Sequence, residues 1–304
     1  MTSKSAPRQR RPVVMAVHAH PDDESSQTGG TLARYAARGC RTVLVTCTDG
    51  SQGDAAGGFK PGGTEHDPHA VAHYRAAELD QAAAALGIDD VLKLGYPDSG
   101  MAGTTTLAGD RIAFSELPVR PLIGAMARAI RLFRPDVILT YPPNGLSEHP
   151  DHIRTHDIVV AAHQNIVAAA DWGPPEAPGP RLYYIALSRS RLDRAGSAVR
   201  EAFGDDAWAP PPSAGVDDAS ITTVIDVSEY WDQKLQALAA HASQADAAAL
   251  LKMFSVFEAA GSEARTEEYV RAYPPVTSSE SGVIERDFFD SAQETCFPRG
   301  FVSA

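Results

Sequence analysis

Residues 13–47 have the sequence VVMAVHAHPDDESSQTGGTLARYAARGCRTVLVTC. The apolar run Val13–His18 is typical of a buried strand, and the β-branched run Thr42–Cys47 is typical of a second one. Between them, Gly29–Arg38 has helical spacing of its apolar residues, and Gly39 follows as a C-terminal cap. A strand, a helix and a strand within about 35 residues form a βαβ unit, which predicts a parallel sheet.

The alternation of strands and helices continues along the chain. We expect further strands at Val91–Leu94, Asp136–Tyr141, Arg181–Leu187 and Ile221–Val227, and helices at Pro68–Leu86, Pro121–Phe133, Asp151–Ala170 and Tyr230–Phe257. The composition changes at Trp172–Pro180, which contains four prolines. We therefore expect a disordered arm at 1–12, an α/β core at 13–170 and a smaller α+β cap region at 171–304 that completes the same domain.

The composition narrows the class of protein. Of the 304 residues, 43% are hydrophobic and 22% are charged, which is typical of a folded globular chain. The net charge of −12 argues against nucleic-acid binding. No apolar run approaches the roughly 20 residues that cross a bilayer, so no membrane association is expected. Three cysteines form no disulfide framework, which favours the cytoplasm. Homo-oligomer formation is left open.

Two short clusters of acidic residues and histidines follow predicted strands. HPDDE occupies 20–24, directly after the first strand, and HPDH occupies 149–152, in the loop after Asp136–Tyr141. Ligands of open α/β sheets bind at the carboxyl ends of the strands. The two clusters therefore lie at one edge of the sheet and can converge on one metal ion.

A catalytic zinc ion uses three protein ligands and keeps a fourth position for water. His20 and Asp23 are three residues apart and can face one point as the chain enters a helix, and His152 supplies the third ligand. Imidazole and carboxylate suit Fe²⁺ as well as Zn²⁺. The competing interpretation is that an aspartate here only caps a helix. Glu24 is either an acid close to the site or a first-turn charge favoured by the helix dipole.

The remaining acid–base residues suggest amide hydrolysis. Asp22 precedes a predicted ligand, and its carboxylate could accept a proton from a metal-activated water. His149 could then stabilise the oxyanion or protonate the leaving amine. Asp151 could orient His149. We also find no serine-hydrolase elbow and no glycine-rich nucleotide-binding loop after a strand.

The motifs AHPDDE at 19–24 and HPDH at 149–152 resemble the signature of the LmbE-like family (GlcNAc-PI de-N-acetylase, PIG-L). Members of this family are zinc-dependent hydrolases of N-acyl groups on amino sugars and have a Rossmann-like fold. The resemblance therefore implies a mostly parallel sheet flanked by helices. It also implies the roles already given to both motifs: His20, Asp23 and His152 match the zinc ligands, Asp22 the general base, His149 the oxyanion-stabilising histidine, and Asp151 its neighbour.

Within the family, the chain looks most like the mycothiol branch, which contains the N-acetylglucosaminyl-inositol deacetylase and the mycothiol S-conjugate amidase. By this resemblance, Arg75 and Asp98 match residues that bind the sugar or inositol. Ser147 stands where the mycothiol enzymes carry a tyrosine that helps to polarise the scissile carbonyl. The resemblance implies a small-molecule N-acylated amino-sugar substrate.

Several alternatives stay open at this point. A mycothiol S-conjugate amidase and a deacetylase of a secondary-metabolite glycoside would use the same metal chemistry. A non-haem Fe(II) oxygenase uses the same set of two histidines and one carboxylate. A non-catalytic sugar-binding protein could retain the fold.

Overall fold

The computed structural model describes residues 10–103, 111–169, 172, 179–204, 211–260, 265–277, 280 and 282–289. Of the arm expected at 1–12, residues 1–9 lie outside this description, and so do residues 173–178 of the proline-rich stretch. Within the described residues, no helix has both the length and the apolar character to cross a membrane.

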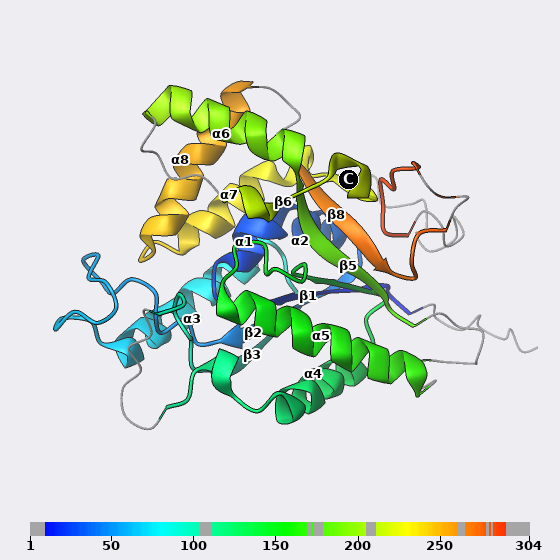
Figure 1. Ribbon diagram of the computed structural model, residues 1–304, viewed down its shortest axis with the longest axis horizontal. Helices are drawn as coiled ribbons and strands as arrows, with labels where there is room; N and C mark the ends of the chain where they lie inside the picture. The colour runs from blue at the N-terminus through cyan, green and yellow to red at the C-terminus, as the bar shows by residue number, and fades with distance from the viewer. Residues whose placement is uncertain are drawn as a thin grey trace, which may run out of the picture.

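One eight-stranded sheet forms the centre of the molecule (Figure 1). Its strands are β1 (Val13–His18), β2 (Arg41–Thr48), β3 (Asp90–Tyr96), β4 (Val137–Thr140), β5 (Arg181–Ser188), β6 (Gly215–Val216), β7 (Thr223–Asp226) and β8 (Thr266–Tyr273). The order is β3-β2-β1-β4-β5-β8-β7, and β6 pairs with β5. Strands β1 to β5 are parallel, whereas β8 runs antiparallel to both β5 and β7. The expected mostly parallel α/β sheet is confirmed.

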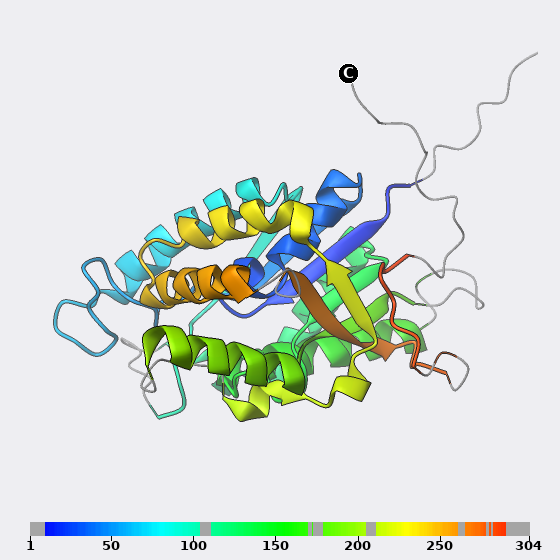
Figure 2. The same cartoon turned by 90° about the horizontal axis from the view of Figure 1, so that it is seen from above.

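Helices cover both faces of the sheet. They are α1 (Asp23–Gln27), α2 (Gly29–Ala37), α3 (Pro68–Ala85), α4 (Val119–Phe133), α5 (Pro150–Ala168), α6 (Arg189–Phe203), α7 (Trp231–Ala240) and α8 (Ala245–Ala260). Helices α4 and α5 pack together on one face, and α2, α3 and α7 pack on the other (Figure 1). Helix α7 also contacts α8, which packs against α6 (Figure 2). The segments after residue 170 thus build on the same sheet as those before it.

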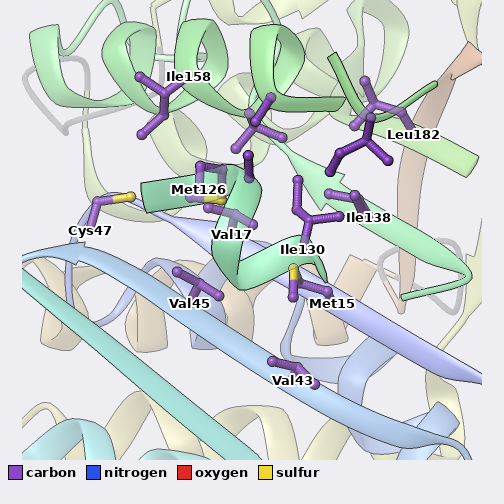
Figure 3. Close-up of a cluster of buried hydrophobic side chains, with 14 of the residues drawn as sticks. Met15, Val17, Val43, Val45, Cys47, Met126, Ile130, Ile138, Ile158 and Leu182 are labelled. Carbon is purple, nitrogen blue, oxygen red and sulfur yellow. The ribbon is translucent and has the colours of Figure 1, made fainter. Parts of the chain in front are cut away.

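The core alternates between the two faces along β1. Val17 packs with Met126 of α4 and Ile158 of α5 in one buried cluster (Figure 3). Its neighbour Ala16 points to the other face, into the cluster that contains Trp231 of α7. This alternation follows from the period of two in a strand. Because helices bury both faces, the strand has a continuous apolar sequence.

The expected single helix at Tyr230–Phe257 is wrong, because the chain forms two helices there, α7 and α8. Alanine-rich composition favours one continuous helix. The break comes from tertiary hydrogen bonds made by the intervening residues. His241 bonds to Glu24 through its ring, and Ser243 donates its backbone N–H and its hydroxyl to the Glu78 carboxylate, each at 2.8 Å. These contacts hold the chain in a non-helical path between the two helices.

Candidate functional site

The candidate site lies where the strand order reverses. Successive strands from β1 to β3 extend the sheet in one direction, and β4 then pairs with the opposite side of β1. Ligands of open α/β sheets bind in the crevice at such a point. HPDDE follows the carboxyl end of β1, and HPDH spans the start of α5, whose N-cap is His149. The two motifs therefore meet at this edge, as the sequence predicts.

The three side chains predicted to bind metal meet in a tight triangle. Nδ1 of His20 lies 3.2 Å from Nε2 of His152 and 3.3 Å from Oδ2 of Asp23. Nε2 of His152 and Oδ2 of Asp23 are 3.4 Å apart. A tetrahedral ion with bonds of roughly 2.0–2.1 Å separates its ligand atoms by about 3.3 Å. The triangle therefore has the dimensions of one face of a zinc coordination sphere.

The far nitrogens of both rings face hydrogen-bond acceptors. Nδ1 of His152 lies 2.9 Å from the carbonyl oxygen of Gly145, and Nε2 of His20 lies 3.2 Å from Oδ2 of Asp151. Each far nitrogen must carry a proton to make its bond. This arrangement leaves the near nitrogens, which lie 3.2 Å apart, as the atoms that can bind a metal ion.

Asp23 is held from several directions, and one of its partners had no signal in the sequence. The hydroxyl of Tyr141 donates to Oδ2 of Asp23 at 2.7 Å and accepts from the backbone N–H of Ala19 at 2.8 Å. The Tyr141 ring also stacks on His152, with centroids 4.2 Å apart. Tyr141 follows β4 in a buried position, so the sequence suggests only a core residue. The structure adds it to the site as a support for two predicted ligands.

The electrostatics of the cluster favour a cation. Burial alone would lower the pKa of His20, but the nearby Asp98, Asp151 and Asp23 carboxylates outweigh burial and raise this pKa well above its usual value. Burial likewise opposes ionisation of Asp23, and the two histidines reverse this and hold its pKa well below its usual range. An environment that stabilises a protonated imidazole also stabilises a divalent ion held at the same place.

His149 lies beside the triangle. Its ring centroid is 4.5 Å from that of His20, and potential ligand atoms of His20, His149 and His152 lie within 4.8 Å of one another. Nδ1 of His149 accepts a hydrogen bond from the backbone N–H of Asp151 at 3.1 Å, so the ring proton is on Nε2. Burial, followed by the neighbouring His20 and His152, lowers the pKa of His149 to about 2. His149 is therefore a neutral hydrogen-bond donor. The set of His20, Asp23 and His152 is tighter than the set that includes His149, so it suits a metal ion better.

The Asp151 carboxylate faces away from His149. Oδ2 accepts from the backbone N–H of Ser99 at 2.9 Å and faces His20, and Oδ1 accepts from the Ser99 hydroxyl. Asp151 thus contacts His149 only through its own backbone, among the hydrogen bonds of the described residues. Its side chain instead orients a predicted metal ligand, and Ser99 is a further residue that the sequence analysis did not identify.

Asp22 has the most exposed carboxylate of this group. Its side chain is 24% exposed, compared with 9% for Asp23 and 0% for Asp151. Oδ2 accepts from the Arg75 guanidinium at 2.9 Å. Burial raises the pKa of Asp22 to about 6, although Arg75 acts in the opposite direction. A carboxylate with a pKa near neutrality and access to solvent suits the transfer of protons.

The three residues matched to substrate binding occupy different environments. The Arg75 guanidinium is buried and donates to the carbonyl oxygens of Gly50 and Pro21 as well as to Asp22. Asp98 is also buried, with Oδ1 3.5 Å from Nε2 of His20. Ser147 is exposed, and its hydroxyl lies 3.4 Å from Nδ1 of His152. A role for these residues in sugar binding stays a prediction.

Fold and site together define a class: an α/β protein with two histidines and a carboxylate at the switch point of its sheet, a donor set used by catalytic metals. Comparisons with known proteins agree. The family described as PIG-L, GlcNAc-PI de-N-acetylase, matches residues 15–163. A 1D-myo-inositol 2-acetamido-2-deoxy-alpha-D-glucopyranoside deacetylase from Rhodococcus erythropolis is 40% identical over 241 residues, which cover 76% of this chain and 80% of the relative. The chain belongs to the PIG-L family, and the resemblance seen in its motifs is confirmed.

Solved structures share the fold. N,N'-diacetylchitobiose deacetylase from Pyrococcus horikoshii aligns with a TM-score of 0.57 and 20% identity, over 85% of this chain and 83% of that one. The 4-carboxy-2-hydroxymuconate hydratase from Pseudomonas putida KT2440 aligns with a TM-score of 0.59 and 19% identity, over 88% and 98% of the two chains. One fold thus carries two reactions, and the reaction must be argued from the site.

Proposed function

We propose that the protein is a zinc-dependent hydrolase that removes an N-acyl group, most simply acetyl, from the nitrogen of an amino-sugar glycoside. The observation that carries the proposal is the triangle formed by Nδ1 of His20, Oδ2 of Asp23 and Nε2 of His152, with sides of 3.2–3.4 Å. The relative from Rhodococcus erythropolis, which is named as a deacetylase of an acetylated amino sugar, supports the substrate class.

When bound, zinc would polarise the amide carbonyl and lower the pKa of a water molecule to about 7. Asp22 accepts a proton from the attacking water as the water oxygen forms a bond to the carbonyl carbon. Nε2–H of His149 donates to the oxygen on which negative charge develops. The C–N bond then breaks, and Asp22 passes the proton to the leaving nitrogen. The products are a carboxylic acid and the free amine, and the acid then gives its proton to the amine or to solvent.

The remaining residues hold these groups in place. Asp151 and the carbonyl oxygen of Gly145 orient His20 and His152, and Tyr141 orients Asp23. Arg75 lies against the Asp22 carboxylate and favours its ionised form. Such preorganisation supplies much of the rate enhancement in enzymes, because the groups need not rearrange during the reaction.

The proposal is tested by amine release from N-acetylglucosaminyl-inositol, measured with zinc-loaded protein, chelator-treated protein and protein to which zinc is restored. We expect release that chelation abolishes and zinc restores. A panel of other N-acetyl glycosides and a mycothiol S-conjugate, assayed in parallel, identifies the preferred substrate. Absence of release from the whole panel, with one metal ion bound per chain, would overturn the proposal. Consumption of dioxygen with a 2-oxoacid by the iron-loaded protein would instead favour the oxygenase alternative.

A further inference from the structure

The backbone of Asp22 is strained. Its φ of 113° and ψ of −27° lie in the left-handed region, which is unfavourable for a residue other than glycine and persists only where the surroundings enforce it. Its carbonyl oxygen accepts from the N–H groups of Ser25 and Ser26 at 3.1 and 3.0 Å. Its own N–H donates to Oε2 of Glu24 at 3.0 Å. The Glu24 carboxylate is therefore one of the groups that enforce this conformation.

Glu24 is completely buried, which is unusual for a glutamate. While Oε2 accepts from the Asp22 backbone, Oε1 accepts from the Ser25 hydroxyl at 2.5 Å and from Nε2 of His241 at 2.8 Å. A first-turn charge that only complements the helix dipole would remain in solvent. The position of Glu24 indicates a structural role near the site. Both of its carboxylate oxygens accept hydrogen bonds, and one accepts from Asp22, the residue before the predicted metal ligand Asp23.

His241 comes from the far end of the chain and is also fully buried. It stands at the C-terminus of α7, 217 residues after Glu24. The following residues fix this corner, because Ser243 bonds to Glu78 and the Gln244 amide bonds to the backbone of Asp54. The ring of His241 is therefore presented to Glu24 from a rigid support.

We propose that Glu24 and His241 form a positioning pair that holds Asp22 in its left-handed conformation. The pair thereby directs the catalytic carboxylate of Asp22 toward the predicted metal site. His241 fixes the Glu24 carboxylate, and Glu24 fixes the backbone N–H of Asp22. Neither residue touches substrate. The inference rests on the proposed function, in which Asp22 is the general base. It also explains why the alanine-rich segment breaks into α7 and α8 at His241.

The test compares conservative and disruptive variants of the pair. Glu24→Gln keeps an oxygen for the Asp22 N–H, and His241→Gln keeps an N–H near the position of Nε2, whereas Glu24→Ala and His241→Leu remove these groups. We expect the disruptive variants to lose about 10- to 100-fold in kcat. Their KM and metal content should stay within about twofold of wild type, and the conservative variants should keep most of kcat.

Lys234→Met is the matched control. Lys234 lies on α7, and His241 is the C-cap of the same helix. Lys234 forms a buried ion pair with Glu267, in which Nζ lies 2.5 Å from Oε1. This variant should lose stability while its kcat stays near that of wild type. The positioning role is refuted if His241→Leu lowers kcat no more than Lys234→Met does, or if the conservative variants lose as much activity as the disruptive ones.

A second measurement separates this inference from the proposed function. If the wild-type protein releases no amine, the proposed function fails, and hydrogen–deuterium exchange of the peptide covering residues 20–26 then decides the positioning role. We expect this peptide to exchange at least about tenfold faster in Glu24→Ala than in Lys234→Met, because the Asp22 N–H loses its acceptor. Equal exchange in the two variants would overturn the inference even if the enzyme is active.

Discussion

The carbonyl oxygen of Gly145 lies 2.9 Å from Nδ1 of His152 and so fixes which nitrogen of that ring faces the other two predicted metal ligands. Gly145 has a φ of +66°, and a Cβ added to it would lie 2.8 Å from Cβ of His152. A glycine is required here both for the backbone conformation and for the close approach.

Gly145→Ala is therefore expected to weaken zinc binding by about 10- to 100-fold, which is typical of the loss of a group that orients a ligand. Competition with a chromophoric chelator measures the change. The control is Gly39→Ala, because Gly39 also has a positive φ, of +83°, but no atom lies within 4 Å of the added Cβ. Equal zinc affinities of the two variants would contradict the assigned role of Gly145.

Asp22→Asn is expected to retain zinc and to lose about 10²- to 10⁴-fold in kcat, the usual contribution of a general base. Asparagine tolerates the left-handed backbone of residue 22, so the loss reports on proton transfer. Metal analysis and steady-state kinetics on the same samples check both halves of the prediction. A variant with bound zinc and a near-normal kcat would show that another group accepts the proton.

The pair formed by His241 and Glu24 predicts how stability depends on pH. Burial would lower the pKa of His241, but Glu24 outweighs it and raises this pKa above 6.5. The stabilising contribution is therefore complete below pH 6.5 and is lost as pH rises through the raised pKa. For Glu24, burial would raise the pKa, but His241 outweighs it and holds the pKa below 4.5. This contribution is complete above pH 4.5 and is lost as pH falls through the lowered pKa.

Urea denaturation of the chelator-treated protein at several pH values tests this expectation without interference from metal binding. The free energy of unfolding of the wild type should fall more steeply above pH 6.5 than that of His241→Gln. Parallel curves for the two proteins would mean that His241 gains no proton affinity on folding.

The ion pair between Lys234 and Glu267 predicts a large effect on stability alone. The Glu267 carboxylate accepts from the N–H groups of Gly30 and Thr31 in the first turn of α2, and from Lys234 Nζ at 2.5 Å. Lys234→Met leaves the buried carboxylate unpaired and should cost about 3–5 kcal/mol of unfolding free energy. Adding Glu267→Gln removes the charge but leaves one of the two backbone N–H groups without an acceptor, so it should recover only part of this loss. Denaturation midpoints of the two variants would coincide if the unpaired charge were unimportant.

Local sequence accounts for much of the fold. The apolar runs at Val13–His18 and Thr42–Cys47 were expected as strands, and the structure has β1 and β2 there. By contrast, the apolar periodicity did not indicate α6 or β8. The charged helix α6 and the half-buried antiparallel strand β8 depend on their packing against β5 and α8, which no local pattern encodes.

The sequence by itself determined the βαβ unit, the placement of both histidine motifs after parallel strands and the residue types that can bind a metal. These features depend on neighbours in the chain, namely a period of two or 3.6 and ligands three residues apart. Only the tertiary structure decided the partners of those residues: Asp151 with His20, Arg75 with Asp22, and His241 with Glu24. These pairs are 131, 53 and 217 residues apart in the chain. They meet because the order of the strands and the break between α7 and α8 bring them together, and no spacing within one segment carries that information.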